Sequence, residues 1–406
     1  MLRSLFVDFN SYFASVEQQM QPHLRGKPVA VVPVMAETTC CIALSREAKN
    51  LGLNGGLRLS EARRACPQLQ VVEARPPLYV EIHHALKDAI DSCVPVDSEE
   101  SIDEMHCKLT GKWQQREVAI QLAKEVKQAI VRKVGPYVRC SIGIGPNMML
   151  AKAATDMEKI DGLVVIDEHE LPERLYTLEL RDLSGIGRRM EARLSAVGIR
   201  TIEQLWRTPR AKFRKIWGTV EGERMHDSLH GQWVPRLEKR KSLVSHSHVL
   251  SPAQRNDEDA RAVILRLLQK AVARLHRIRH YACGLSLFIE YLGGGGFSTE
   301  VTFLESQDTL HFIRAFKKLW QQRPYRPEPP MMVGIGLFDL VAEENFTPSL
   351  FEHEQTIRRT VLSHTVNELN ARFGRNKVYF AGAHTALDSA PMRIAFNYVP
   401  EHRAND

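Results

Sequence analysis

The sequence predicts a multidomain α+β protein. At 406 residues the chain is too long for one compact core, which favours about two to four domains. Strand patterns alternate with long helices through the first 165 residues, residues 170–232 carry only helical patterns, and residues 244–343 alternate strand and helix again. These three stretches predict an α/β layer, a helical region and a second α+β layer.

The chain begins with an apolar run that contains one carboxylate. Residues 3–9 (RSLFVDF) predict a buried strand, and Asn10 or Ser11 can cap the helix that begins SYFASVEQQM. Further strands are expected over 27–34 and 42–44, and helices over 45–51, 60–65 and 79–92, with a glycine-rich turn between the first two helices.

Residues 96–110 (VDSEESIDEMHCKLT) predict a strand, a turn and a second strand. Residues 115–134 have an amphipathic helical pattern, and residues 137–145 and 147–159 then predict a strand and a helix. The apolar stripe of the amphipathic helix consists of Val118, Leu122, Val126, Ile130 and Val134.

A Gly-Ile-Gly turn at Gly185–Gly187 lies between two short helical patterns, as in a helix–hairpin–helix. Glycine removes the side-chain barrier, so that backbone N–H groups can approach DNA phosphates closely. An ordinary connection with glycines at the helix ends explains this pattern equally well.

The second half of the chain opens with a basic segment over residues 233–243, interpreted as a linker and containing Arg236, Lys239, Arg240 and Lys241. The glycine run at 293–296 favours a hairpin turn over a phosphate cradle, because no helix pattern follows it. A loop is expected over 324–330, and the tail predicts a helix over 355–373 and a short strand, VYFAG, over 378–382.

Composition limits the class of protein. The net charge of +7 suits a polyanionic partner, although a solvated linker and a polar helix face would also account for the basic clusters. Seven scattered cysteines without a C-x-x-C pair favour reduced, buried thiols over disulfides or a zinc site. With no apolar run of roughly 18 residues and no signal-peptide pattern, we expect no membrane partner and a cytoplasmic protein.

Three carboxylates carry the chemical prediction. Asp8 lies in a strand that should be buried, where an unpaired carboxylate would cost several kcal/mol. Asp103 and Glu104 are adjacent, so both can reach one site only at a bend or strand end. Converging carboxylates suit Mg²⁺, although each residue alone is more often a capping or salt-bridging group.

Four motifs occur in the order and spacing of Y-family DNA polymerases of the UmuC/DinB type: FVDFNSYFASVE, SIDE, SIGIGPNMMLAK and LSGIG. The chain therefore resembles this family over residues 1–240 and more loosely to its end. The tail ELNARFGRNKVYFAG and Asn10 are more similar to UmuC than to DinB. The resemblance implies a right hand with an α/β palm (1–20 and 72–165), small fingers (20–72), a helix–hairpin–helix thumb (166–232), a basic linker (233–243), an α+β little finger (244–343) and a tail (344–406).

The resemblance also implies roles for individual residues. Asp8, Asp103 and Glu104, with the backbone of Phe9, would bind two Mg²⁺ ions, for which Mn²⁺ could substitute. Phe13 matches the steric gate that excludes ribose, although a core aromatic beside Tyr12 is the alternative. The other nucleotide-binding candidates are Tyr12, Arg46, Lys49 and Lys159. The DNA-binding candidates are Gly185, Gly187 and the four cations of the linker.

Lys159 matches the lysine that reaches the triphosphate, and Lys152 lies seven residues earlier on nearly the same helix face, or pairs with Asp156. Four positions depart from the family pattern and affect the expected nucleotide affinity. These are Arg46 in place of a tyrosine, Lys49 in place of an arginine, Met148 in place of a lysine and Ile160 in place of a proline.

The expected function is template-directed translesion synthesis of low fidelity, with primer–template DNA and dNTPs as substrates and a role in DNA repair and SOS mutagenesis. Expected partners are a sliding clamp, which residues 347–351 (TPSLF) loosely suit, a UmuD-like subunit and a recombinase filament. The alternatives are an inactive accessory relative that acts as a DNA-binding scaffold, and a palm-based nucleotidyl cyclase.

Overall fold

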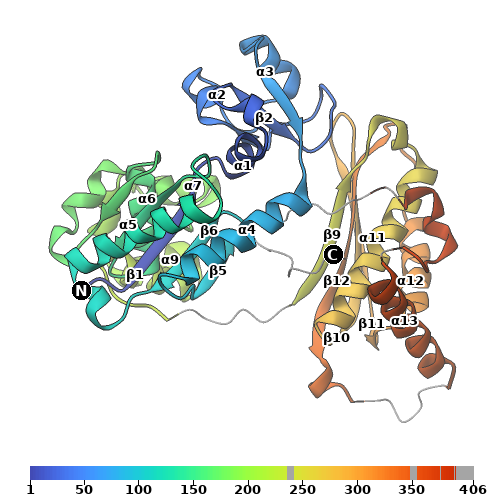
Figure 1. The fold of residues 1–406 in the computed structure, drawn as a ribbon. Coiled ribbons are helices and arrows are strands. Elements are labelled where there is room, and N and C mark those ends of the chain that lie inside the picture. Colours follow the sequence, from blue (N-terminus) through green and yellow to red (C-terminus); the bar gives the residue numbers. More distant parts are fainter. Residues whose placement is uncertain (236–241, 348–353, 375, 388, 390–406) are drawn as a thin grey trace. The chain divides into compact units, whose positions relative to one another are not determined.

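The computed structural model describes residues 1–235, 242–347, 354–374, 376–387 and 389. They fall into two compact units, one within Met1–Arg236 and the other within Leu237–Arg393 (Figure 1). Both units combine sheets with helices, which confirms the predicted multidomain α+β class. Among the described residues, no helix is both long enough and apolar enough to cross a membrane.

The first unit is built on a five-stranded sheet with strand order β5-β6-β1-β7-β8. Its strands are β1 (Ser4–Phe9), β5 (Ser98–Ser101), β6 (Glu104–Lys108), β7 (Cys140–Gly145) and β8 (Leu163–Val165). The central strand β1 pairs antiparallel with both β6 and β7, and its run Leu5-Phe6-Val7 is buried on both faces. The predicted buried strand is therefore the middle of the sheet.

Four helices accompany this sheet: α1 (Tyr12–Met20), α4 (Pro76–Asp91), α5 (Arg116–Lys133) and α6 (Met148–Met157). In α5 the middle of the predicted stripe is buried, whereas Val118 at its start and Val134 at its end are only partly buried. Ala119 and Ala123 lie on the buried face of α5 in place of Val118, where a small side chain lets a neighbouring helix approach closely. At the start of α1, Ser11 makes no capping hydrogen bond, so the predicted cap is wrong.

A smaller sheet of the first unit has strand order β3-β2-β4. It comprises β2 (Val29–Val32), β3 (Ala43–Leu44) and β4 (Gln70–Glu73), with α2 (Arg46–Asn50) and α3 (Leu59–Ala65) packed nearby. β2 is fully buried and its core partners include Leu44, Leu59 and Ala62. The sequence did not predict β4, because its four residues are partly exposed and show no clear alternation.

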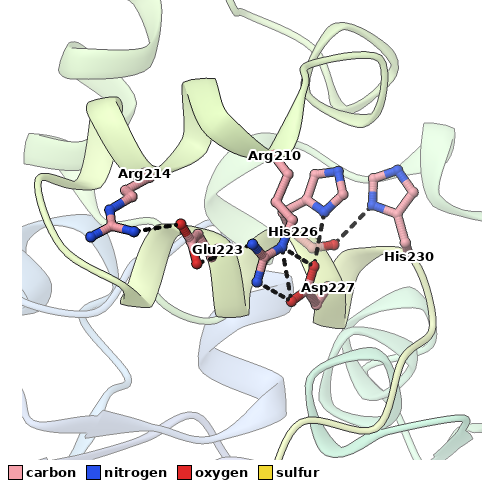
Figure 2. Close-up of polar contacts among 6 residues, drawn as sticks. All are labelled: Arg210, Arg214, Glu223, His226, Asp227 and His230. Carbon is pink, nitrogen blue, oxygen red and sulfur yellow. Dashed lines mark hydrogen bonds and ion pairs between the residues drawn. The ribbon is translucent and has the colours of Figure 1, made fainter.

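The helical region predicted over residues 170–232 is confirmed as α7 (Arg188–Ala196), α8 (Ile202–Trp206), α9 (Arg210–Trp217) and α10 (Glu221–Leu229), preceded by 3₁₀ turns. Figure 2 shows the polar contacts that join α9 to α10. Arg210 binds both carboxylate oxygens of Asp227 and also reaches Glu223, to which Arg214 donates at 3.0 Å. The rings of His226 and His230 stack with centroids 4.1 Å apart beside this network.

The second unit confirms the predicted order of strand, helix, strand, strand, helix and strand. These elements are β9 (Leu243–Val249), α11 (Asp257–Arg277), β10 (His280–Tyr291), β11 (Gly296–Ser306), α12 (Thr309–Gln321) and β12 (Pro330–Ala342). The strands form an antiparallel sheet in the order β11-β10-β12-β9. Gly293, Gly294 and Gly295 all have positive φ, as the predicted hairpin turn requires.

The tail contains α13 (Glu354–Phe373), close to the helix that the sequence predicts. The strand predicted over residues 378–382 is wrong. The side-chain oxygen of Asn370 accepts from the backbone N–H groups of Lys377 and Val378, and a 3₁₀ helix then spans Ala381–Ala386. Asn370 thus takes two N–H donors that a sheet would need, and Ala383 and Ala386 pack into the core around α11 instead.

All seven cysteines are free, as the sequence predicts. Burial raises the pKa of the Cys107 and Cys140 thiols to about 12. Both therefore remain protonated at neutral pH and serve as small core residues.

We expect the ion pairs of Asp227 to stabilise the helical region fully only above the carboxylate's ordinary pKa. Its hydrogen bond with Arg210 lowers the pKa of Asp227 below the ordinary value of 3.8, so the stabilisation is complete above that pH and disappears as pH falls through the lowered pKa. Asp227→Asn should lower the melting temperature at pH 7 by on the order of 1–3 °C, measured by circular dichroism. The melting temperatures of the two proteins should converge only as pH falls through the lowered pKa of Asp227, which lies below 3.8. Asp88→Asn, which removes an exposed carboxylate on α4, should change the melting temperature little.

Candidate active site

Two of the predicted metal-binding carboxylates face each other on the central sheet. The antiparallel pairing of β1 and β6 places Asp8 directly opposite Glu104. Side chains that are directly opposite in an antiparallel pair point to the same face of the sheet, so their carboxylates are neighbours. The two residues are 96 positions apart in sequence, and the strand register alone brings them together.

Asp103 lies in the turn that joins β5 to β6, immediately before Glu104. This is a strand end, where adjacent side chains are freed from the alternation of a regular strand. The backbone N–H of Phe9 donates to the carbonyl oxygen of Asp103 at 2.9 Å, which ties the turn to the end of β1. The carboxylate of Asp103 accepts from the hydroxyl of Ser101 at 2.7 Å.

The ammonium group of Lys152 lies between the two facing carboxylates. Lys152 extends from α6, and its Nζ donates to Oδ2 of Asp8 and to Oε1 of Glu104, the latter at 2.6 Å. The alternative prediction that Lys152 pairs with Asp156 is wrong, because Asp156 pairs with Lys159 at 3.3 Å. The site therefore already holds one cation between two carboxylates.

The electrostatics of the site indicate a surplus of negative charge. Burial raises the pKa of Asp8, Lys152 opposes that shift, and Glu104 adds to it. Burial also raises the pKa of Asp103, and the nearby charge of Asp8 contributes. Burial alone would lower the pKa of Lys152, but the two carboxylates outweigh it and raise that pKa. A further cation beside Asp8, Asp103 and Glu104 would relieve the repulsion among the three carboxylates.

The oxygen atoms of this site suit a hard divalent cation. In the part of the chain that the structure describes, no three His, Cys, Asp or Glu side chains are gathered in a geometry that could hold a metal ion. Here Asp8 and Glu104 share the lysine ammonium, and Asp103 is turned to Ser101. The cation that Asp8 and Glu104 already hold shows that these two carboxylates can converge on one positive charge.

The aromatic candidates next to the site are buried. Tyr12 is 2% exposed and its hydroxyl donates to the carbonyl oxygen of Tyr79 at 2.6 Å, which fixes its ring in the core. Phe13 is 4% exposed and stacks on the ring of Tyr79, with centroids 4.7 Å apart and planes inclined by 28°.

A buried carboxylate that the sequence analysis missed supports these rings. Glu17 is fully buried on α1 and accepts hydrogen bonds from Arg75, from the hydroxyl of Tyr79 at 2.7 Å and from Gln21 at 2.6 Å. This network fixes Tyr79 beneath Phe13. An acidic residue one helical turn after Phe13, in a segment that is otherwise buried, was the signal available in the sequence.

The three predicted nucleotide-binding cations, Arg46, Lys49 and Lys159, differ in their surroundings. Arg46 begins α2 and is exposed, and Lys49 lies one turn later. Burial lowers the pKa of Lys49, and the charge of Lys159 lowers it further. The sequence predicted a helix that reaches Lys159, but α6 ends at Met157. Lys159 lies in the following turn, with 68% of its side chain exposed.

The candidate DNA-binding glycines are open to an approaching partner. Gly185 has a φ of 92°, Gly187 precedes α7, and a Cβ at either position would meet no atom within 4 Å. The other DNA-binding candidates, Arg236, Lys239, Arg240 and Lys241, lie outside the described residues, as do residues 348–351 of the clamp-like segment.

Three protein-family models match the chain. The impB/mucB/samB family matches residues 7–156, its C-terminal domain matches residues 240–350, and the thumb domain of DNA polymerase iota matches residues 181–232. The first match contains all three carboxylates, and the third contains the Gly-Ile-Gly turn.

The similar proteins are named as DNA polymerases. DNA polymerase IV of Moorella thermoacetica is 35% identical, covering 93% of this chain and 95% of the relative, and DNA polymerase IV of Pelotomaculum thermopropionicum is 31% identical, covering 92% and 93%. Among solved structures, a Y-family DNA polymerase chimera matches with a TM-score of 0.70 at 23% identity, over 84% of this chain and 99% of that chain. The match to this solved structure shows a shared fold.

Removal of the resident cation should expose the repulsion at the site. In Lys152→Met, the carboxylates of Asp8 and Glu104 face each other without a counter-charge, which should destabilise the metal-free protein by about 1–3 kcal/mol. We expect a lower melting temperature in EDTA and a larger rise on adding Mn²⁺ than in the wild type. Lys124→Met, exposed on α5, serves as the control. Equal Mn²⁺ responses of the three proteins would contradict a shared cation position.

Proposed function

The chain belongs to the impB/mucB/samB family of Y-family DNA polymerases and is a DNA-directed DNA polymerase of translesion synthesis, and on that premise we propose that Asp8, Asp103 and Glu104 are its catalytic carboxylates. Members of this family depend on divalent metal ions. The observation that carries the assignment is the pairing of Asp8 with Glu104 across neighbouring strands around one cation.

We assign the metal as Mg²⁺, two ions per site, with Mn²⁺ as a substitute. When bound, such ions act as Lewis acids that favour deprotonation of the primer 3′-hydroxyl and neutralise charge on the pyrophosphate leaving group. Asp8 and Glu104 supply facing oxygen ligands, Asp103 approaches from the adjoining turn, and the backbone of Phe9 ends the strand beside them. Lys152 would leave its position between the carboxylates as they take up the metal.

The incoming dNTP is proposed to lie next to these carboxylates. Lys159 and Lys49 would hold its triphosphate, because the charge of Lys159 disfavours the charge of Lys49 and a bound anion would offset that repulsion. Arg46 offers a further exposed cation at the start of α2. Lysine at position 49 binds phosphate as a point charge, without the bidentate geometry that arginine would provide.

Phe13 is proposed as the group that selects deoxyribose over ribose. Its ring rests on Tyr79, which Glu17 and Arg75 hold in place. A ring fixed in this way cannot retreat from a ribose 2′-hydroxyl, which would clash with it and lose its hydrogen bonds to water.

The domain boundaries are proposed as the sequence predicts them: palm (1–20 and 72–165), fingers (20–72), thumb (166–232), linker (233–243), little finger (244–343) and tail (344–406). The five-stranded sheet supports the palm, and the α7–α10 helices support the thumb. Primer–template DNA would contact the Gly185–Gly187 turn, whose open backbone admits a phosphate, and the basic linker.

Three protein partners are proposed on the family resemblance: a sliding clamp at residues 347–351, a UmuD-like subunit and a recombinase filament. The alternative of an inactive DNA-binding scaffold is not favoured, because all three carboxylates are present and two of them already share a cation.

Asp8→Asn should slow polymerisation severely and leave DNA binding intact. Loss of one ligand charge should slow primer extension with Mg²⁺ by on the order of 10²–10³-fold or more, since charge stabilisation dominates such reactions. Affinity for the primer–template, measured by fluorescence anisotropy, should stay within about two-fold. Asp88→Asn, an exposed carboxylate on α4, is the matched control. Full extension by Asp8→Asn would exclude the assignment.

Phe13→Leu should raise incorporation of ribonucleotides relative to deoxyribonucleotides by about ten-fold or more. The shorter side chain opens space at the ribose 2′ position and keeps more of the core volume than alanine does. The ratio of kcat/KM for rNTP and dNTP measures the effect, with Tyr137→Ala as a control for an aromatic group at a partly exposed position. An unchanged ratio would remove Phe13 from this role.

A further inference from the structure

The turn that carries Lys159 is held at several points by residues beside the carboxylates. α6 ends at Met157, residues 158–161 form the turn, and β8 begins at Leu163. The side chain of Lys159 is mostly exposed at this turn. The backbone on both sides of it is hydrogen-bonded to neighbouring strands, so that an exposed side chain extends from a fixed base.

Asn10 is the central residue of this attachment. Its side-chain oxygen accepts from the backbone N–H of Asp161 at 3.0 Å, and its side-chain nitrogen donates to the hydroxyl of Ser141 at 3.1 Å. That hydroxyl in turn donates to the carbonyl oxygen of Glu158 at 2.7 Å. Asn10 thus binds one side of the turn directly and the other side through Ser141.

Two further contacts complete the attachment. The ammonium of Lys127 donates to the backbone and side-chain oxygens of Asp161, both at 2.7 Å, and to the carbonyl oxygen of Cys140 at 2.8 Å. Gly162 packs so closely under the turn that a Cβ would lie 2.1 Å from the carbonyl oxygen of Glu158. Any larger residue at position 162 would therefore push the turn outward.

The attachment points adjoin the catalytic strand. Asn10 lies two residues after Asp8, and Ser141 is the strand partner of Asp8 on β7. The backbone of Asn10 is itself fixed, because its N–H donates to Arg139 and its carbonyl accepts from the hydroxyl of Ser15 at 2.6 Å. The position of the turn is therefore set relative to the carboxylates by short, rigid links.

We propose that Asn10 is a positioning residue that, with Ser141, sets where the ammonium of Lys159 meets the triphosphate of the incoming nucleotide. The inference rests on the proposed function, in which Lys159 binds that triphosphate. Asn10 itself touches no substrate. It acts by fixing the turn, which reduces the conformational freedom that Lys159 must lose when the nucleotide binds.

The test is a double-mutant cycle between Asn10→Ala and Lys159→Ala in primer extension, with kcat and the dNTP KM measured separately. Asn10→Ala should raise the KM by about five-fold, the order expected for lost hydrogen bonds, with kcat within about two-fold. In the Lys159→Ala background, Asn10→Ala should raise the KM no further. Ser141→Ala should give a smaller rise, because the direct bond from Asn10 to Asp161 remains.

Gly162→Ala displaces the same turn by a different route and should reproduce the KM effect, again only when Lys159 is present. Asn54→Ala, exposed in a loop of the first unit, is the control. Independent, multiplicative effects of Asn10→Ala and Lys159→Ala, or a lowered kcat with unchanged KM, would overturn the inference. Extension by both the wild type and Asp8→Asn would instead overturn the proposed function, so the two failures are distinguishable.

Discussion

The first unit depends on one electrostatic constraint, the meeting of two carboxylates across neighbouring strands in a partly buried place. Asp8 and Glu104 are opposite residues of β1 and β6, so neither can move to the other face of the sheet without a change in strand register. Burial raises the pKa of Asp8, and Glu104 raises it further. The fold can keep both groups charged only if a cation stays between them, and Lys152 provides it in this structure.

The surroundings of the carboxylates follow from this constraint. α6 must lie close enough for Lys152 to reach them, and its start is fixed by Asn147, whose side chain caps the helix and also donates to Ser228 and Gln232 near the end of α10. The same helix ends just before the turn that carries Lys159. One element thus delivers a cation to the carboxylates at its middle and a second cation to the proposed triphosphate site at its end.

A second buried charge organises the other side of the site. Glu17 is fully buried and would be costly without Arg75, whose guanidinium binds both of its oxygens. Glu17 also holds the hydroxyl of Tyr79, on which Phe13 stacks. The proposed gate ring therefore rests on an ion pair between α1 and the residue that precedes α4. The position of the Phe13 ring therefore depends on the pairing of Glu17 with Arg75 as much as on packing.

The sequence by itself determined the elements whose periodicity is local. The buried strand containing Asp8 and the six alternating elements of the second unit follow from apolar spacing, which a strand or helix imposes on its own residues. Local patterns failed where a distant partner decided the outcome. Asn10 does not cap α1 because its amide is bound by Ser141 and Asp161, and residues 378–382 form no strand because Asn370 takes two of their neighbouring donors.

Only the tertiary structure decided how the site is assembled. Three contacts join residues that are 48 to 151 positions apart in the sequence: the pairing of Asp8 with Glu104, the ion pairs of Lys152 with both of them, and the hydrogen bond of Asn10 to the Lys159 turn. No local propensity encodes such distances. They are set by strand register and by the need to neutralise charge that the fold has removed from water, and both are properties of the assembled core.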